Sequence, residues 1–323
     1  MKKLTKRWLL VILIICLYQI IVFAARKAGY DFALTWGGEG IGNRQFVEPR
    51  GIFADKENNI YLADSGNHRI QKFDNTGIFM LKWGKEGAGN GEFSFPCGLA
   101  VDNQGNIFVA DTYNHRIQKF DSNGRFIAKW GNKGSKAGKF NMPYKVAIDT
   151  NNYVYVSDTN NCRIQKFDNS GKFIAAWGKK GVKKGEFGWP TGLVVSKTGA
   201  IIVADSDNKR VQRFNSQGKL LSIWTTKQTL NSEFHSPLDL AIDHQGNFYL
   251  VEARGNCLRK FSSQGKFLWE WEDFGYNTGE FHFPCGIAVD STGNIYIADS
   301  RNNRVQKFVP HPSFFRKYLL FGK

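Results

Sequence analysis

The chain has 323 residues, of which 42% are hydrophobic and 15% aromatic, with only 8 prolines. This composition is typical of a packed, β-rich globular protein and excludes an intrinsically disordered one. The formal net charge is +16, but nine of the 44 basic residues and none of the 28 acidic residues lie in residues 1–27 and 309–323. The other 35 basic residues exceed the 28 acids by only seven, which weakens the case for a nucleic-acid-binding protein.

The N-terminal residues predict a membrane or export segment. Residues 8–25 carry no charge, and eighteen residues are just long enough to cross the hydrocarbon core of a bilayer. Val22 and Ala24 also form an acceptable cleavage site, so a secreted protein released from a signal peptide is the alternative. We expect an uncleaved anchor. Four basic residues precede the apolar run and two follow it, which predicts a cytoplasmic N-terminus and an extracytoplasmic remainder.

A 47-residue period organises most of the chain. The phenylalanine that opens each copy recurs at Phe46, Phe93, Phe140, Phe187, Phe234 and Phe281. In the second copy four short β-type runs, 98–101, 106–110, 116–120 and 126–130, are separated by Asn-, Asp- and Gly-rich turns. The second run is apolar without alternation, which indicates a sheet covered on both faces. Four strands in each of six copies predict an all-β, six-bladed β-propeller of four-stranded antiparallel blades.

The last copy lacks its fourth strand, and the missing strand is found at the other end of the chain. Residues 31–36 align with residues 78–83 at the 47-residue step, so we expect the N-terminal segment to complete the last blade and close the ring. The predicted organisation is a basic stub and membrane or signal helix (1–27), a monomeric propeller (28–308) and a basic aromatic tail (309–323). This tail either packs on a blade or lies on a membrane surface.

The repeat motif resembles the NHL repeat. The motif Pro-x-Gly-[Ile/Leu]-Ala-Val-Asp is followed by an Asn-containing loop that reads Asn-His-Arg at Asn67–Arg69 and Asn114–Arg116. This resemblance implies a six-bladed propeller. It groups the chain with tripartite-motif NHL domains that bind RNA, with metal-dependent peptidyl-hydroxyglycine amidating lyases and with membrane-tethered bacterial NHL proteins. The paired Cys/His ligands of zinc modules are missing from the sequence, so ubiquitin-ligase activity is not implied.

Residues that recur in the copies are expected to be structural. Asp111 and Arg116 have counterparts in four other copies, and we expect the carboxylate and the guanidinium to satisfy backbone groups of the same loop. The tryptophans of the outer strands are expected to pack between blades. Function is expected where the copies differ, on the face that carries the loops between second and third strands and the loops into the next blade.

The first group of departures is predicted to line the mouth of the central channel, as a rim that binds a ligand. Its members are Arg50, Tyr144, Lys145, Thr191 and Asp239, with Trp189 beside them. His235 and His282, in adjacent blades, are candidate ligands for a divalent metal, because amidating lyases hold zinc through channel histidines. No third ligand is apparent, and water-exposed histidines are the alternative. No other cofactor is predicted.

The second group of departures is a set of seven lysines on two neighbouring loops: Lys133, Lys136, Lys139, Lys179, Lys180, Lys183 and Lys184. These lysines predict either a binding surface for a polyanion or a solvated surface that favours solubility. Anionic lipid head groups or acidic envelope polymers suit an extracytoplasmic domain better than RNA does.

The sequence therefore predicts a membrane-anchored binding protein for a protein, peptide or polyanionic ligand. A metal-dependent lyase or hydrolase at the channel mouth and an RNA-binding propeller are the alternatives. No nucleophile–base pair or glycine-rich phosphate loop is visible, so enzymatic activity is not the favoured interpretation. Cys97, Cys162, Cys257 and Cys285 lie in four different copies and are expected to be free thiols.

Overall fold

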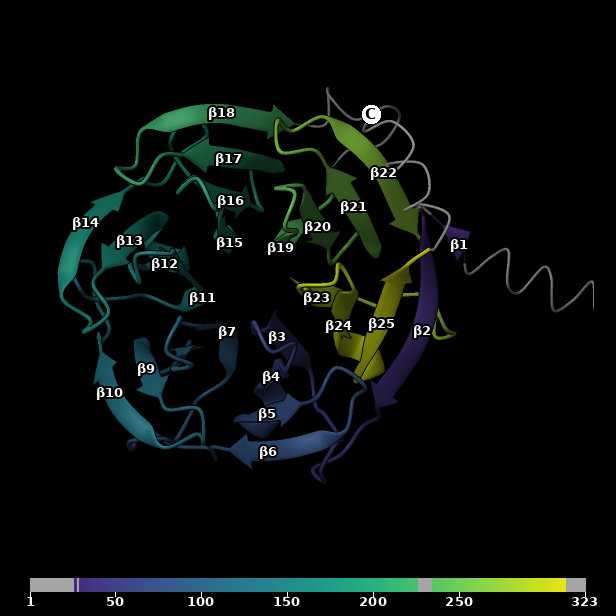
Figure 1. Ribbon diagram of the computed structural model, residues 1–323. Helices are drawn as coiled ribbons and strands as arrows, with labels where there is room; N and C mark the ends of the chain where they lie inside the picture. The colour runs from purple at the N-terminus through teal and green to yellow at the C-terminus, as the bar shows by residue number, and fades with distance from the viewer. Residues whose placement is uncertain (1–25, 28, 226–233, 312–323) are drawn as a thin grey trace, which may run out of the picture.

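The computed structural model describes residues 26–27, 29–225 and 234–311, and these form six sheets arranged in a ring (Figure 1). Each sheet has its strands in chain order, and the inner strands of neighbouring blades contact one another around the ring. The predicted all-β, six-bladed propeller with four-stranded antiparallel blades is confirmed.

The innermost strands are β3 (Pro49–Ala54), β7 (Pro96–Val101), β11 (Pro143–Ile148), β15 (Pro190–Val195), β19 (Pro237–Ile242) and β23 (Pro284–Val289). The second strands are β4 (Ile60–Asp64), β8 (Ile107–Asp111), β12 (Val154–Asp158), β16 (Ile201–Asp205), β20 (Phe248–Glu252) and β24 (Ile295–Asp299). The third strands are β5 (Arg69–Phe73), β9 (Arg116–Phe120), β13 (Arg163–Phe167), β17 (Arg210–Phe214), β21 (Cys257–Phe261) and β25 (Arg304–Pro310). The outer strands are β6 (Phe79–Trp83), β10 (Phe126–Trp130), β14 (Phe173–Trp177), β18 (Leu220–Thr225), β22 (Phe267–Glu272) and β2 (Tyr30–Gly37).

The hydrophobic core lies between the blades. All five residues of each second strand are buried, because a neighbouring blade covers each face of the sheet. Phe108 of blade two packs in one cluster with Phe140 and Phe167 of blade three. The phenylalanine that opens each copy is fully buried, and each contributes about 2 kcal/mol of apolar burial.

The ring closes as the sequence predicts. Strand β2 pairs antiparallel with β25, from Tyr30 opposite Pro310 to Gly37 opposite Arg304. The short strand β1 (Arg26–Lys27) pairs with the start of β2. No helix long and apolar enough to cross a membrane occurs among the described residues. The predicted anchor at residues 8–25 and the tail from residue 312 lie outside them.

The recurring Asp and Arg hold the loops together, as expected. Oδ2 of the fully buried Asp111 accepts hydrogen bonds from Arg116 Nε at 2.7 Å and from Gln118 Nε2 at 3.0 Å. Both terminal nitrogens of Arg116 donate to carbonyl oxygens of the loop that enters the same blade. A buried carboxylate and the carbonyl groups of a long loop are satisfied by one guanidinium, which is a structural role.

Candidate functional site

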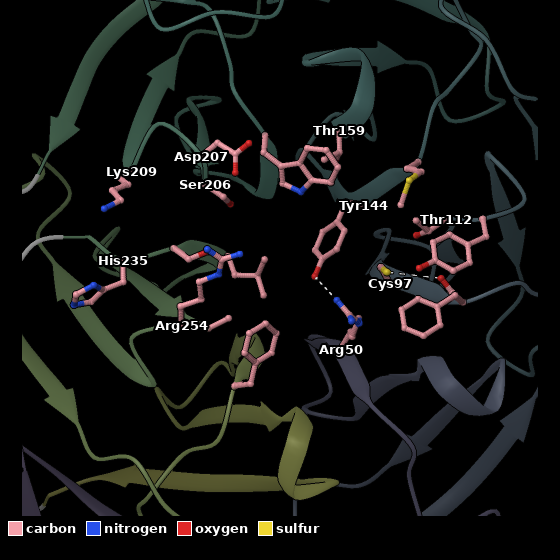
Figure 2. Close-up of a pocket in the computed structure, with 18 residues that line it drawn as sticks. Arg50, Cys97, Thr112, Tyr144, Thr159, Ser206, Asp207, Lys209, His235 and Arg254 are labelled. Atoms are coloured by element: carbon pink, nitrogen blue, oxygen red, sulfur yellow. Dashed lines mark hydrogen bonds between the residues drawn. The ribbon is translucent and has the colours of Figure 1, made fainter.

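A cavity of about 530 Å³ opens on the loop face, which we define as the face formed by the second-to-third-strand loops and the blade-to-blade loops. Its aromatic wall consists of Phe95, Tyr113, Tyr144, Trp189 and Phe283 (Figure 2). Arg50, Lys209 and Arg254 also line it, against one carboxylate, Asp207. The cavity is therefore aromatic with an excess of positive charge.

Three positions of the repeat supply these side chains. One is the residue before the proline that opens each inner strand, as in Phe95 and Trp189. Another is the residue after that proline, as in Arg50 and Tyr144. The third is two residues after the motif acid, as in Arg254. The copies differ at all three positions, so each blade presents a different side chain to the same cavity.

The motif histidines help to aim the cavity residues. Phe95 and Met142 have positive φ angles, of 54° and 55°, in the turn before the inner strand. Their backbone N–H groups donate to Nδ1 of His68 and of His115 in the preceding blade, each at 3.0 Å. Burial, reinforced by the positive charge of Lys133, lowers the pKa of His115, so its ring remains a neutral acceptor. The Asn-His-Arg triplet thus positions an adjacent blade's cavity side chain.

Arg50 is the best-placed group for binding an anion. Its side chain is 23% exposed, and its guanidinium lies 4.8 Å from the centre of the Phe95 ring. Its hydrogen bonds are long: Nη1 lies 3.5 Å from Tyr144 Oη, and Nη2 lies 3.5 Å from Glu48 Oε2. Nε is buried and finds no hydrogen-bond partner in the described part of the chain. Arg50 therefore keeps donor capacity for an acceptor that enters the cavity.

The groups around Arg50 are protonated at neutral pH. Burial raises the pKa of Tyr144 and of Cys97, and raises the pKa of Cys285 to about 11. Burial alone would lower the pKa of Arg50, but Tyr144 and the two thiols outweigh this effect and hold its pKa above the ordinary value. The site therefore combines a permanent cation with neutral thiols and a neutral phenol. Cys97, Cys162, Cys257 and Cys285 are all free, as predicted.

Lys145 and Asp239 lie away from the cavity, inside the channel. They replace glycines of the other inner strands and are only 5% and 2% exposed. Lys145 Nζ donates to Asp239 Oδ2 at 2.6 Å, which joins blade three to blade five across the channel. Burial raises the pKa of Asp239, and Lys145 opposes this shift. The ion pair occupies both side chains, so neither lines the cavity.

Thr191 is also placed inside the structure. It is fully buried, and its hydroxyl lies 2.7 Å from Ser206 Oγ and 3.4 Å from the Pro237 carbonyl oxygen. Of the predicted rim residues, the structure brings Arg50, Tyr144 and Trp189 together in the cavity. It adds Tyr113, Lys209 and Arg254, which sequence reasoning missed. Comparing the copies two residues after each motif acid would have found Tyr113 and Arg254.

The seven predicted lysines lie on the loops that leave β10 and β14. Six are exposed and Lys139 is half-buried. Only one carboxylate, Glu186, belongs to these two loops, and it pairs with Lys179 at 3.5 Å. None of the seven lines the cavity. They form a basic patch, which we call the lysine patch, on the same face outside the cavity mouth.

The two predicted metal ligands are in different surroundings. His235 lines the cavity, whereas the His282 ring packs against Phe274 and Tyr276, with centroid distances of 5.3 and 5.5 Å. Among the described residues, no group of three His, Cys, Asp or Glu side chains is placed to hold a metal ion. The side chains present do not fit a metal site, so no chemical step through a metal is derived.

The family model of the NHL repeat matches residues 46–73, 93–120, 140–167, 187–214 and 281–308. The fifth copy, from Phe234 to Phe261, is not matched. In that copy Glu252, Gly255, Cys257 and Arg259 replace the Asp, Asn, Arg and Gln of the others. A search of curated protein sequences found no significant match.

Solved structures share the fold at low sequence identity. A Bacteroides thetaiotaomicron protein of unknown function superposes with a TM-score of 0.64 and 18% identity, over 85% of this chain and 73% of that one. A gluconolactonase from Xanthomonas campestris gives 0.60 and 13%, over 83% and 87%. Catalytically inactive virginiamycin B lyase from Staphylococcus aureus, with quinupristin, gives 0.57 and 14%, over 84% and 82%. These similarities concern the fold.

Proposed function

We propose that this chain, a six-bladed β-propeller of NHL repeats, binds a peptide or small ligand that carries a carboxylate beside an aromatic or apolar group, in the cavity around Arg50. The observation that carries the proposal is the guanidinium of Arg50, which has an unpaired buried Nε and lies against an aromatic ring. A carboxylate offers the acceptors that a guanidinium binds best. The cavity volume falls within the range of small-ligand sites.

Binding is favoured over covalent catalysis because the hydroxyl and thiol groups of the cavity are not activated. The hydroxyls of Thr112 and Thr159 donate to carbonyl oxygens of the next blade, at 2.8 and 2.7 Å. Cys97 and Cys285 have raised pKa values because they are buried, which keeps them as thiols at neutral pH. A nucleophile needs the opposite treatment, namely a nearby base or a lowered pKa.

The lysine patch extends the proposed binding surface. Its exposed ammonium groups lie on loops that border the cavity on one side, since Trp189 ends the second of these loops and lines the cavity. An acidic peptide whose C-terminal carboxylate enters the cavity would place its acidic side chains over these lysines. Such a patch accelerates association with a polyanion and makes binding sensitive to salt.

We further propose that residues 8–25 anchor the chain in a membrane with the propeller on the extracytoplasmic side. The proposal is supported by the uncharged eighteen-residue run and by the excess of basic residues before it.

Acetylated dipeptides that end in phenylalanine test the cavity. We expect the free acid to bind the full chain and its C-terminal amide to bind about 10-fold more weakly or worse, because a charge-assisted hydrogen bond contributes about 1.5–3 kcal/mol. Arg50→Met should weaken the free acid by the same factor, measured by calorimetry. Arg44→Met is the matched control, since Arg44 is an exposed arginine on the same face. Equal affinity for acid and amide would refute carboxylate recognition.

A further inference from the structure

Both ends of the described chain lie at one edge of blade six. Tyr30 begins β2 opposite Pro310, and the His311 N–H donates to the Gly29 carbonyl oxygen at 2.9 Å. Strand β1 folds back on the same edge, with Arg26 opposite Asp31 (Figure 1). The far end of β2, Gly37, pairs with Arg304 at the loop face. The chain therefore enters and leaves the propeller on the face opposite the cavity around Arg50.

The connection to the apolar N-terminal run is short. Only residues 26–29 separate residue 25 from β2, and four extended residues span at most about 14 Å. The eight residues of β2 separate its first residue from the loop face by about 27 Å. A segment inserted in a bilayer at residue 25 can therefore bring the exit edge to the membrane but cannot bring the loop face to it.

The C-terminal tail begins beside this edge and has the composition of an interfacial segment. Residues 312–323 contain Phe314, Phe315, Tyr318 and Phe321 together with three basic residues and no acidic residue. Aromatic side chains favour the head-group region, and basic side chains are attracted to anionic lipids. Two weak attachments made side by side give stable anchoring and fix orientation, which one attachment does not.

We propose that residues 1–25 and 312–323 attach the propeller to one bilayer at the exit edge of blade six. The cavity around Arg50 and the lysine patch then open away from that bilayer. The N-terminal half of this inference rests on the anchor proposed above. The ligand of the cavity then arrives from the aqueous side. The lysine patch meets a soluble acidic partner and not the lipid head groups of the membrane that carries the protein.

Energy transfer to the membrane surface tests the orientation. The full chain is reconstituted in vesicles of equal amounts of phosphatidylcholine and phosphatidylglycerol that contain a head-group acceptor dye. A donor dye is placed on Gln264→Cys, at the outer loop between β21 and β22 on the exit face, or on Thr278→Cys, on the loop face. Both residues are exposed, and the native thiols among the described residues are buried. We expect severalfold more transfer from residue 264 than from residue 278. Equal transfer, or more from residue 278, would overturn the proposal.

Two further measurements separate the parts of the inference. Truncation after His311 should reduce the difference between the two probes, and an unchanged difference would remove the tail from the proposal. An intact mass that lacks the first 25 residues, or failure of the chain to float with vesicles, would overturn the N-terminal attachment. The acetylated dipeptide acid is titrated in the same vesicles. Loss of this binding with the orientation retained would refute the cavity proposal alone.

Discussion

Removing the carboxylate charge of Asp239 should destabilise the propeller strongly. Lys145 and Asp239 are 5% and 2% exposed and are joined at 2.6 Å across the channel. Asp239→Asn keeps the side-chain volume but leaves the Lys145 ammonium in an apolar channel without its counter-charge. Breaking a buried ion pair on one side costs about 3–5 kcal/mol, because the remaining charge is uncompensated. Replacing both partners together, as in Lys145→Met with Asp239→Leu, should recover most of that loss.

Urea unfolding of the two single variants and the double variant measures this coupling. We expect each single variant to lose about 3 kcal/mol or more and the double variant to lie well above the sum of the two. The control is Lys179→Met, which breaks an ion pair whose lysine is 78% exposed and should cost no more than about 1 kcal/mol. If Asp239→Asn costs as little as the control and the two changes are additive, the pair does not bear a buried charge.

Two further predictions concern stability. Arg116→Met removes the partner of the fully buried Asp111 and should lower the free energy of unfolding by about 3 kcal/mol, whereas the exposed Arg125→Met should change it little. Equal urea midpoints for the two variants would contradict the structural role of the motif arginine. Burial, with the nearby Asp243 and Asp290, raises the pKa of Tyr30 to about 12. Its contribution to stability is therefore present below the ordinary tyrosine pKa of about 10 and is lost as the pH rises toward 12. Tyr30→Phe should flatten that alkaline loss in a pH series of thermal unfolding, and an unchanged pH profile would contradict it.

The repeat made the fold accessible from sequence, because each strand is bounded by turn residues that recur at the same step. The predicted second, third and fourth runs of copy two, 106–110, 116–120 and 126–130, match β8, β9 and β10 within one residue at each end. Only the first run was short: β7 begins at Pro96, where its pairing with Asp111 precedes a break in register. Ring closure by residues 31–36 was equally readable, since a missing strand must be replaced to satisfy an edge.

The site was predictable only in part, because a departure from the repeat does not say which way a side chain points. Arg50 and Tyr144 turned out to line the cavity, while Lys145, directly after Tyr144, lies inside the channel. Alternation along a strand sends successive side chains to opposite sides, and the register is shifted between Pro143 and Val146. Charge pairing across the channel between blades three and five has no local signature in the sequence.

Departures from the repeat divide into those that the fold compensates and those that it does not. In blade five Arg259, two residues beyond the usual position, pairs with Glu252 at 3.0 Å and with Glu270 at 3.3 Å. The motif acid is thus neutralised by a different arginine, which explains why the family model misses this copy while the blade keeps its four strands. Arg50 also departs from its column, but its buried Nε has no partner among the described residues and its other hydrogen bonds are long. A substitution that restores every polar contact maintains the blade, whereas one that leaves a buried donor open provides a site for a ligand.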